Sequence, residues 1–257
     1  MNDDVLDRFL QEIGKNSGPI EPGDPTLDRL PAVFAIDRSD STRQTGDIVE
    51  INAFLRRFAE AVASPPDEAW EKIQAHLNLH IVAYGDRADE ILPWTPGDKL
   101  QPSMIPELTG AGMTSMAAGL EHSSRAMLHC LADFRKQQIP CFRGYIFNVT
   151  DGNATDMWPE SVPDETGIST STPEQRKAKA ARWKHVKSVL DGLETKSTTG
   201  LPYASTFHCA SRKANRDVLG LLAHSTDRVV DLDIANFDKL FKFIRISLTM
   251  AVEDKVG

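Results

Sequence analysis

Apolar residues along this chain fall into two alternating kinds of pattern. The first kind is a short continuous apolar run, and its earliest example is Leu30–Asp37. The second kind follows directly, with apolar side chains at steps of three and four at Ile48, Ile51, Leu55, Phe58 and Val62. A short apolar run predicts a buried strand, whereas the three-and-four spacing predicts a helix that packs one apolar face on a sheet.

The same alternation continues to the end of the chain. Strands are predicted at residues 30–37, 76–86, 88–94, 142–150, 203–210 and 227–233, the second and third forming a hairpin. Helices are predicted at residues 48–62, 115–134, 173–193 and 236–253. Strands that alternate with helices over this length predict an α/β fold, with a doubly wound, mostly parallel central sheet and helices on both faces.

The first 29 residues have a different character from the rest. Val5, Phe9 and Ile13 show helical spacing, and residues 16–26 are rich in glycine and proline. We therefore expect an N-terminal helix and linker over residues 1–29, and one domain over residues 30–257.

Composition limits the functional classes. Of 257 residues, 40% are hydrophobic, and the net charge of −8 argues against nucleic-acid binding, which needs clustered lysine and arginine. Cys130, Cys141 and Cys209 form neither a C-x-x-C pair nor a zinc spacing, which favours a reducing compartment. The acidic start and the lack of an 18-residue apolar run predict neither a secretion signal nor a membrane span. We expect a cytoplasmic protein that binds neither nucleic acid nor membrane.

Oxygen-bearing side chains follow the predicted strands. Asp37 ends the first strand and begins the pattern D-x-S-x-S with Ser39 and Ser41, Thr114 lies at the start of a helix, and Asp151 comes just past another strand. Because loops at the carboxyl ends of strands converge in a doubly wound sheet, these side chains are expected to meet. Mg²⁺ prefers such oxygens and keeps an incomplete protein shell. We predict a site for Mg²⁺, with Mn²⁺ or Ca²⁺ as alternatives, and an open position for an outside carboxylate.

Each piece has another interpretation when taken singly. D-x-S-x-S is also a helix-capping cluster, and T-D-G is usually a turn with its glycine at positive φ. A metal-dependent phosphohydrolase of the haloacid-dehalogenase type also uses an aspartate that ends a strand, but it needs a second aspartate two positions later. That position is Ser39, and Asp40 lies one position beyond. The phosphohydrolase therefore remains the alternative to a non-catalytic site.

Other polar residues receive plainer interpretations. His76 and His80 lie in an alternating apolar run and are expected on the surface or in the core, while His122 and His129 share a helix face without an acidic ligand nearby. The basic run at residues 174–187 predicts a solvated helix face, the alternative being a patch that binds an acidic partner. The irregular stretch at residues 151–172 directly follows Asp151 and is expected to be functional.

Beyond these motifs, the segments IVAYGDRADEILPW, PELTGAGMTSMAAGLE and YIFNVTDGNATDMW resemble the TerY-type branch of von Willebrand factor A domains, which have a metal-ion-dependent adhesion site. The resemblance runs from about residue 30 to 253. It implies a Rossmann-like fold and a non-catalytic, metal-dependent protein-binding role in bacterial stress, tellurium-resistance or defence complexes, with a kinase and a phosphatase of the same gene cluster as candidate partners. The incomplete oxygen shell described above leads us to expect that the protein partner supplies an aspartate or glutamate to the metal. In this branch the turn after T-D-G continues with a proline or small residue, a threonine and an aspartate, and residues 153–156 fill those places. The chain departs from the pattern D-x-S-G-S-M at Asp40, where glycine is usual.

Overall fold

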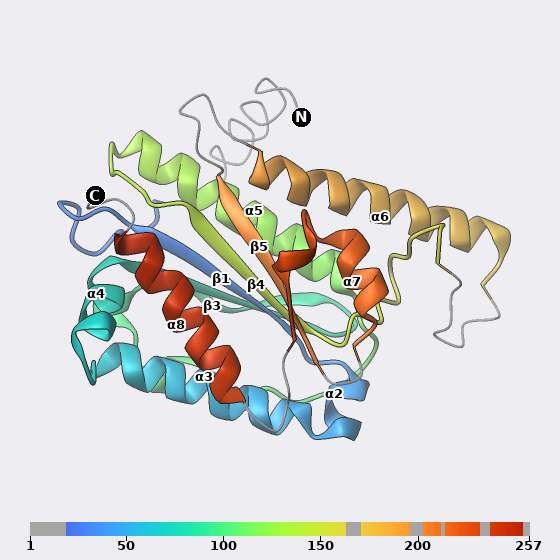
Figure 1. Ribbon diagram of the computed structural model, residues 1–257, viewed down its shortest axis with the longest axis horizontal. Coiled ribbons are helices and arrows are strands. Elements are labelled where there is room, and N and C mark those ends of the chain that lie inside the picture. Colours follow the sequence, from blue (N-terminus) through green and yellow to red (C-terminus); the bar gives the residue numbers. More distant parts are fainter. Residues whose placement is uncertain (1–18, 163–170, 196–202, 212–213, 232–236, 254–257) are drawn as a thin grey trace.

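A computed structural model describes residues 19–162, 171–195, 203–211, 214–231 and 237–253 (Figure 1). Its centre is a six-stranded sheet in the order β3-β2-β1-β4-β5-β6. The strands are β1 (Leu30–Asp37), β2 (Leu77–Tyr84), β3 (Ala88–Pro96), β4 (Gly144–Thr150), β5 (Ala204–Ala210) and β6 (Val229–Asp231). All neighbours run parallel except β3, which forms an antiparallel hairpin with β2. The predicted doubly wound, mostly parallel sheet is confirmed.

Helices cover both faces of this sheet, also as predicted. They are α2 (Asp40–Thr45), α3 (Asp47–Ala63), α4 (Glu68–His76), α5 (Met116–Lys136), α6 (Pro173–Glu194), α7 (Arg216–Leu222) and α8 (Phe237–Glu253), with 3-10 turns at Gly97–Lys99, Pro102–Met104 and Thr226–Arg228. Buried side chains of α3, α4 and α8 share one core, whereas those of α5, α6 and α7 lie in the other cores. Figure 1 shows the two groups on opposite sides of the sheet.

The central strand β1 explains the two-sided core. All eight of its residues are buried, and they alternate between the faces. Phe34 lies in the core under α3, with ring centroids 5.0 Å from Phe58 and 5.8 Å from Phe147. Val33 and Ala35 lie in the cores under α5 and α6. A continuous apolar run is what a parallel strand covered on both faces requires.

Three short helices, α2, α4 and α7, were not predicted, because each offers too few turns for an apolar period to emerge. Helix α4 occupies a region that breaks the apolar pattern, and the Asp67 side chain caps it by accepting a hydrogen bond from the Trp70 backbone N–H. Its last residue is His76, which was expected in the following strand. Helix α7 is capped by Asn215 in the same way. The N-terminal helix expected at residues 5–13 lies outside the described residues.

Residues 19–29 pack against the domain. The Ile20 backbone N–H donates a 2.6 Å hydrogen bond to Asp133 on α5. Arg29 is 1% exposed, and its guanidinium donates to the Asn78 side chain at 2.8 Å and to two backbone carbonyls. The domain boundary at residue 30 stays a prediction, but this segment is held at several points.

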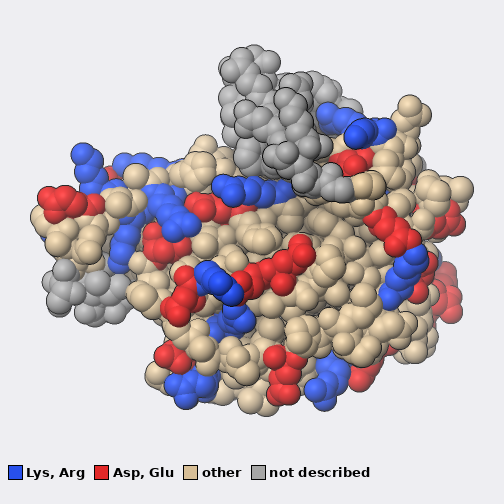
Figure 2. All heavy atoms as spheres, turned by 180° about the vertical axis from the view of Figure 1, so that it is seen from behind, with Lys and Arg blue, Asp and Glu red and all other residues tan. Residues whose placement is uncertain are grey.

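The charged surface is mixed in sign. On the face that Figure 2 shows, lysine and arginine side chains lie beside aspartate and glutamate side chains. Basic side chains on α6 likewise lie beside acidic ones. The ion pairs, 2.6–3.0 Å long, are Arg182–Glu121, Lys184–Glu160 and Lys187–Asp191. Its apolar face, with Trp183, Val186, Leu190 and Leu193, is buried as predicted. Within the described part of the chain, no helix combines the length and apolarity that crossing a bilayer requires.

Candidate metal centre

The chain changes direction within the sheet between β1 and β4. From β1 it first builds β2 and β3 on one side, and it then crosses to build β4 on the other side. Ligand sites form at such switch points, beyond the carboxyl ends of the strands. Asp37 is the last residue of β1, and Asp151 directly follows β4. The pairing of Ile36 with Val149 brings these two ends side by side.

Hydrogen bonds join four of the five predicted residues. The Ser39 backbone N–H donates to Asp37 Oδ1 at 2.9 Å, and Ser41 Oγ donates to Asp151 Oδ2 at 2.7 Å. The hydroxyl oxygens of Ser39 and Ser41 are 2.9 Å apart. The D-x-S-x-S segment therefore links Asp37 to Asp151 through the Ser39 backbone N–H and the two serine hydroxyls.

Thr114 lies in the loop before α5, two residues ahead of the first helical residue. Its carbonyl accepts hydrogen bonds from Thr155 N at 2.9 Å and Thr155 Oγ1 at 3.1 Å. Just before it, the carbonyl of Gly112 accepts from the Asp40 backbone N–H at 2.9 Å. The loop is thus fastened to the segments that follow β1 and β4. The role of Thr114 as a metal ligand stays a prediction, as does that of the other four residues.

The electrostatics of Asp37 are unusual for a carboxyl group. Its side chain is fully buried, and burial together with the charge of Asp151 raises its pKa to about 7. Hydrogen bonds from Ser39 and Thr150 act in the opposite direction. Among the described residues, neither Asp37 nor Asp151 has an ion-pair partner. Two carboxylates close together favour either a shared proton or a cation.

This donor set fits a hard divalent cation. The two carboxylates and the adjacent hydroxyls offer only oxygen atoms, which Mg²⁺ and Ca²⁺ prefer. A cation would offset the repulsion that raises the pKa of Asp37. Carboxylates and hydroxyls alone also leave coordination positions for water or an outside ligand.

Thr150 belongs to the centre and was missed. Its Oγ1 donates to Asp37 Oδ2 at 3.0 Å and accepts from the Gly152 backbone N–H at 3.0 Å. Gly152 has φ +74°, as expected for the T-D-G turn. The turn signal was therefore present in the sequence, but the partner of the threonine hydroxyl depends on how β1 and β4 align.

Asp156 was also missed as a positioning residue. The side chain of Ser115 makes no capping hydrogen bond at the start of α5. Instead, the carboxylate of Asp156 accepts hydrogen bonds from the backbone N–H groups of Ala117 and Ala118 at 3.0 and 3.1 Å. Arg182 of α6 pairs with the same carboxylate at 3.0 Å. The Asp151 loop is thereby attached to both α5 and α6.

The acid at the usual glycine position points elsewhere. The side chain of Asp40 is 50% exposed and pairs with Arg43, one turn along α2, at 3.1 Å. Its charge is therefore partly balanced beside the centre rather than added to the buried pair.

One expectation about histidines is wrong. An acidic side chain does lie near His122, because Glu90 of β3 and His80 of β2 lie against α5 at that point. The sequence analysis searched the same helix, whereas the acid comes from a neighbouring strand.

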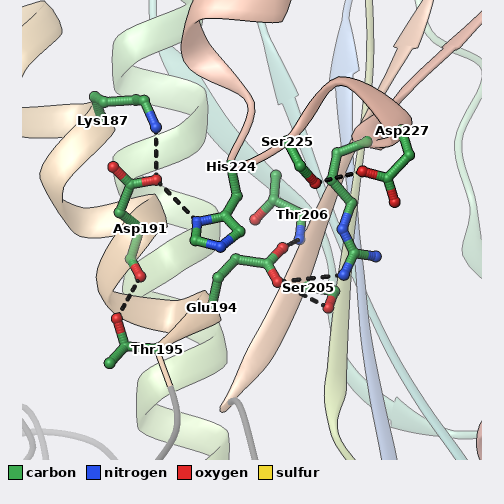
Figure 3. Close-up of polar contacts among 10 residues, drawn as sticks. Lys187, Asp191, Glu194, Thr195, Ser205, Thr206, His224, Ser225 and Asp227 are labelled. Atoms are coloured by element: carbon green, nitrogen blue, oxygen red, sulfur yellow. Dashed lines mark hydrogen bonds and ion pairs between the residues drawn. The ribbon is translucent and has the colours of Figure 1, made fainter.

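A second polar cluster lies where α6 ends beside β5 (Figure 3). The Glu194 carboxylate is 3% exposed and accepts hydrogen bonds from Thr206 N at 2.7 Å and Ser205 Oγ at 3.1 Å. Arg228 Nη2 lies 3.5 Å from it, and the guanidinium stacks over the Phe207 ring at 4.6 Å. Figure 3 also shows Asp191 between Lys187 and His224. In this cluster the protein itself supplies the partners of its acids.

No family model and no curated protein sequence matches this chain. Solved structures do share its fold. A von Willebrand factor type A protein from Catenulispora acidiphila aligns at 15% identity and TM-score 0.53, over 87% of this chain and 43% of that one. The von Willebrand factor domain of the type V pili tip protein Mfa5 from Porphyromonas gingivalis aligns at 13% identity and TM-score 0.51, over 90% of this chain and 97% of that one.

The pilus adhesin SpaC from Lactobacillus rhamnosus GG aligns at 12% identity and TM-score 0.57, over 91% of this chain and 32% of that one. The chain thus spans less than half the length of two of these three structures. The fold is that of von Willebrand factor A domains, as the sequence resemblance implied. The finer likeness to the TerY-type branch stays a prediction.

Proposed function

We propose that this chain is a non-catalytic, metal-dependent protein-interaction module. Asp37, Ser39, Ser41, Thr114 and Asp151 would hold Mg²⁺, with Mn²⁺ or Ca²⁺ as alternatives. The observation that supports this most directly is the buried Asp37 carboxylate beside Asp151, with serine hydroxyls between them. Such an arrangement stabilises a bound cation and destabilises its own ionised, cation-free state.

The partner would supply a carboxylate to the metal. The five residues provide two anionic and three neutral oxygens, which leaves at least one position for an outside ligand on a cation that takes six. Among protein side chains, aspartate and glutamate fit a hard cation best. Structures with this fold include a pilus adhesin and the domain of a pilus tip protein, which supports a role in protein interaction.

The finer assignment rests on the sequence resemblance alone. The segments at residues 81–94, 106–121 and 145–158 support a role in a bacterial stress, tellurium-resistance or defence complex, with a kinase or phosphatase as partner. The three cysteines are free thiols, two of them buried, which agrees with a cytoplasmic location.

The geometry gives little support to the phosphohydrolase alternative. The position of the required second aspartate is Ser39, whose hydroxyl is engaged with Ser41. Asp40 is directed to Arg43 instead. We expect no turnover of a generic phosphate ester with Mg²⁺, and measurable turnover that Asp37→Ala abolishes would favour the alternative.

Calorimetric titration of Mg²⁺ into chelator-treated protein tests the metal site. We expect Asp37→Ala to abolish binding. Asp40→Asn is the matched control, because it removes a neighbouring acid that already has a surface partner. It should change the dissociation constant by no more than about fivefold, since exposed pairs contribute roughly 0–1 kcal/mol.

Affinity purification of the tagged chain, with Mg²⁺ and again with EDTA, tests the interaction. We expect one protein partner to be lost in EDTA and with Asp37→Ala, to be retained with Asp40→Asn, and to depend on one of its own acidic residues. Partner binding that is unchanged in EDTA would contradict the mechanism. The basic run at residues 176–187 would then be the better candidate interface.

A further inference from the structure

A second group of metal-ligating side chains lies within the sheet rather than at its carboxyl edge. One ligand atom from each of His80, Glu90 and His122 lies within 4.8 Å of the other two. His80 Nδ1 is 3.8 Å from Glu90 Oε2, and the stacked rings of His80 and His122 have centroids 6.0 Å apart. Strands β2 and β3 and helix α5 therefore each direct one such side chain to the same point.

The pairing of β2 with β3 is irregular at the place where these three side chains come together. Leu79 pairs with Thr95 and Ile81 with Leu92, so β3 has two residues opposite His80 where a regular ladder would have one. A second register shift brings Glu90 opposite Val82, which lies on the same face of β2 as His80. Bulges re-aim side chains and are common beside functional sites.

His80 is the least expected member of the group. It is 1% exposed, and within the described part of the chain neither of its ring nitrogens has a hydrogen-bond partner. Trp94 stacks on one side of the ring at 5.1 Å. Burial, and then the nearby imidazoles of His122 and His129, lower its pKa to about 3. The ring is therefore neutral and keeps a free lone pair, whereas buried polar atoms are normally satisfied.

We propose that His80, Glu90 and His122 bind a first-row transition metal, Zn²⁺ being the best fit. Two imidazoles and one carboxylate are a common zinc donor set, and such sites leave the fourth position to water or an outside ligand. The Glu90 side chain is 50% exposed, so the metal would be reached from solvent at the β3 edge. The ion would join the hairpin to α5.

This site differs in chemistry from the oxygen-only centre at Asp37. Nitrogen ligands favour Zn²⁺ over Mg²⁺, so excess Mg²⁺ occupies the oxygen centre without competing for the imidazoles. The proposal does not depend on the function proposed above, and Asp37→Ala separates the two.

The test is Zn²⁺ titration into the chelator-treated full chain in excess Mg²⁺, followed by calorimetry and tryptophan fluorescence. Because Trp94 stacks on His80, we expect one Zn²⁺ to bind with a change in fluorescence, and to raise the Tm. His122→Ala and Glu90→Gln alter partly exposed ligands and should each weaken Zn²⁺ binding by at least about tenfold, the lower end of what the loss of an outer-shell partner costs at metal sites. His185→Ala, on the exposed side of α6, is the matched control and should bind Zn²⁺ normally.

Asp37→Ala should retain Zn²⁺ binding, and Trp94→Phe should retain binding but lose the fluorescence change. Unaltered Zn²⁺ affinity in both His122→Ala and Glu90→Gln would overturn the proposal. So would a wild-type chain that takes up no Zn²⁺ in excess Mg²⁺.

Discussion

Asp37 and Glu194 are both buried carboxylates, but their surroundings have opposite signs. Glu194 faces a guanidinium, a hydroxyl and a backbone N–H, all donors from its own chain (Figure 3). Asp37 receives two hydrogen bonds, and its charged neighbour is another carboxylate. Burying an ion requires compensation in either place. For Glu194 the fold itself provides this compensation. For Asp37 we infer that a bound cation provides it.

This difference separates a residue that stabilises the fold from one that is held ready for a ligand. Burial alone does not distinguish them, because both side chains are almost inaccessible to water. The distinguishing feature is the charge of the neighbouring groups. Its effect can be measured as the change in the free energy of unfolding when each acid is neutralised in turn.

Glu194→Gln should give the largest loss of stability, about 3 kcal/mol. Ser205 Oγ and Arg228 Nη2 both lie against Oε2, and an amide NH₂ in that place would face a guanidinium that cannot accept a hydrogen bond. Removing one member of a buried pair costs roughly 3–5 kcal/mol. Urea denaturation would measure it. Asp67→Asn, which breaks the exposed pair with Arg245, is the control and should cost under about 1 kcal/mol. A change of equal size in both variants would contradict the comparison.

Asp37→Asn should have the opposite sign in metal-free protein, a gain of up to about 4 kcal/mol at pH 7.5, because the pKa of Asp37 is raised by about three units and each unit corresponds to about 1.4 kcal/mol. Folding raises the pKa of Asp37 from 3.8 to about 7, so the folded state binds more protons between these values. The free energy of unfolding of the wild type should therefore fall as pH rises from about 4 to 7.

Below about pH 4 both states are protonated, and the wild type and Asp37→Asn should differ little in stability. Denaturation of the wild type and of Asp37→Asn in EDTA across pH 3.5–8 would measure the difference between their free energies of unfolding. Because all other titrating groups are shared, this difference reports on Asp37 alone. Saturating Mg²⁺ should remove the decline in the wild type alone. A variant less stable than the wild type at pH 7.5 would show that Asp37 stabilises the fold as Glu194 does.

Thr150→Val should give the smallest effect, a loss of roughly 1–2 kcal/mol, because it removes two buried hydrogen bonds that contribute about 1 kcal/mol each. The substitution keeps the shape but removes the hydroxyl that donates to Asp37 and accepts from Gly152. Because that hydrogen bond lowers the pKa of Asp37, its loss should move the decline in stability to higher pH. The same denaturation series would show it, and an unmoved decline would exclude Thr150 from the centre.

The parts of the fold that local sequence determines were predictable. The apolar run of β1 requires burial on both faces. The D-x-S-x-S and T-D-G segments take conformations that residues close by in the sequence determine, as the positive φ of Gly152 shows. The meeting of Asp37 with Asp151 could be predicted because strand ends in a doubly wound sheet share one edge.

What could not be predicted depends on alignment between distant segments. The hydroxyl of Thr150 reaches Asp37 through the register of β1 with β4, and Asp156 caps α5 by accepting from Ala117, which lies 39 residues earlier in the chain. Glu90 approaches His122 only because β3 is irregular where it pairs with β2. Helices α2, α4 and α7 were missed for a simpler reason, since so few residues cannot establish an apolar period.

The attachment of Asp156 has a mechanical consequence. A partner that pulls on a cation held by Asp151 would load the loop that follows β4. Through Asp156 that load passes to the first turn of α5 and, through Arg182, to α6. The force would be divided between two long helices rather than concentrated on one turn. The resistance of the loop to being pulled away would then depend on the packing of α5 and α6.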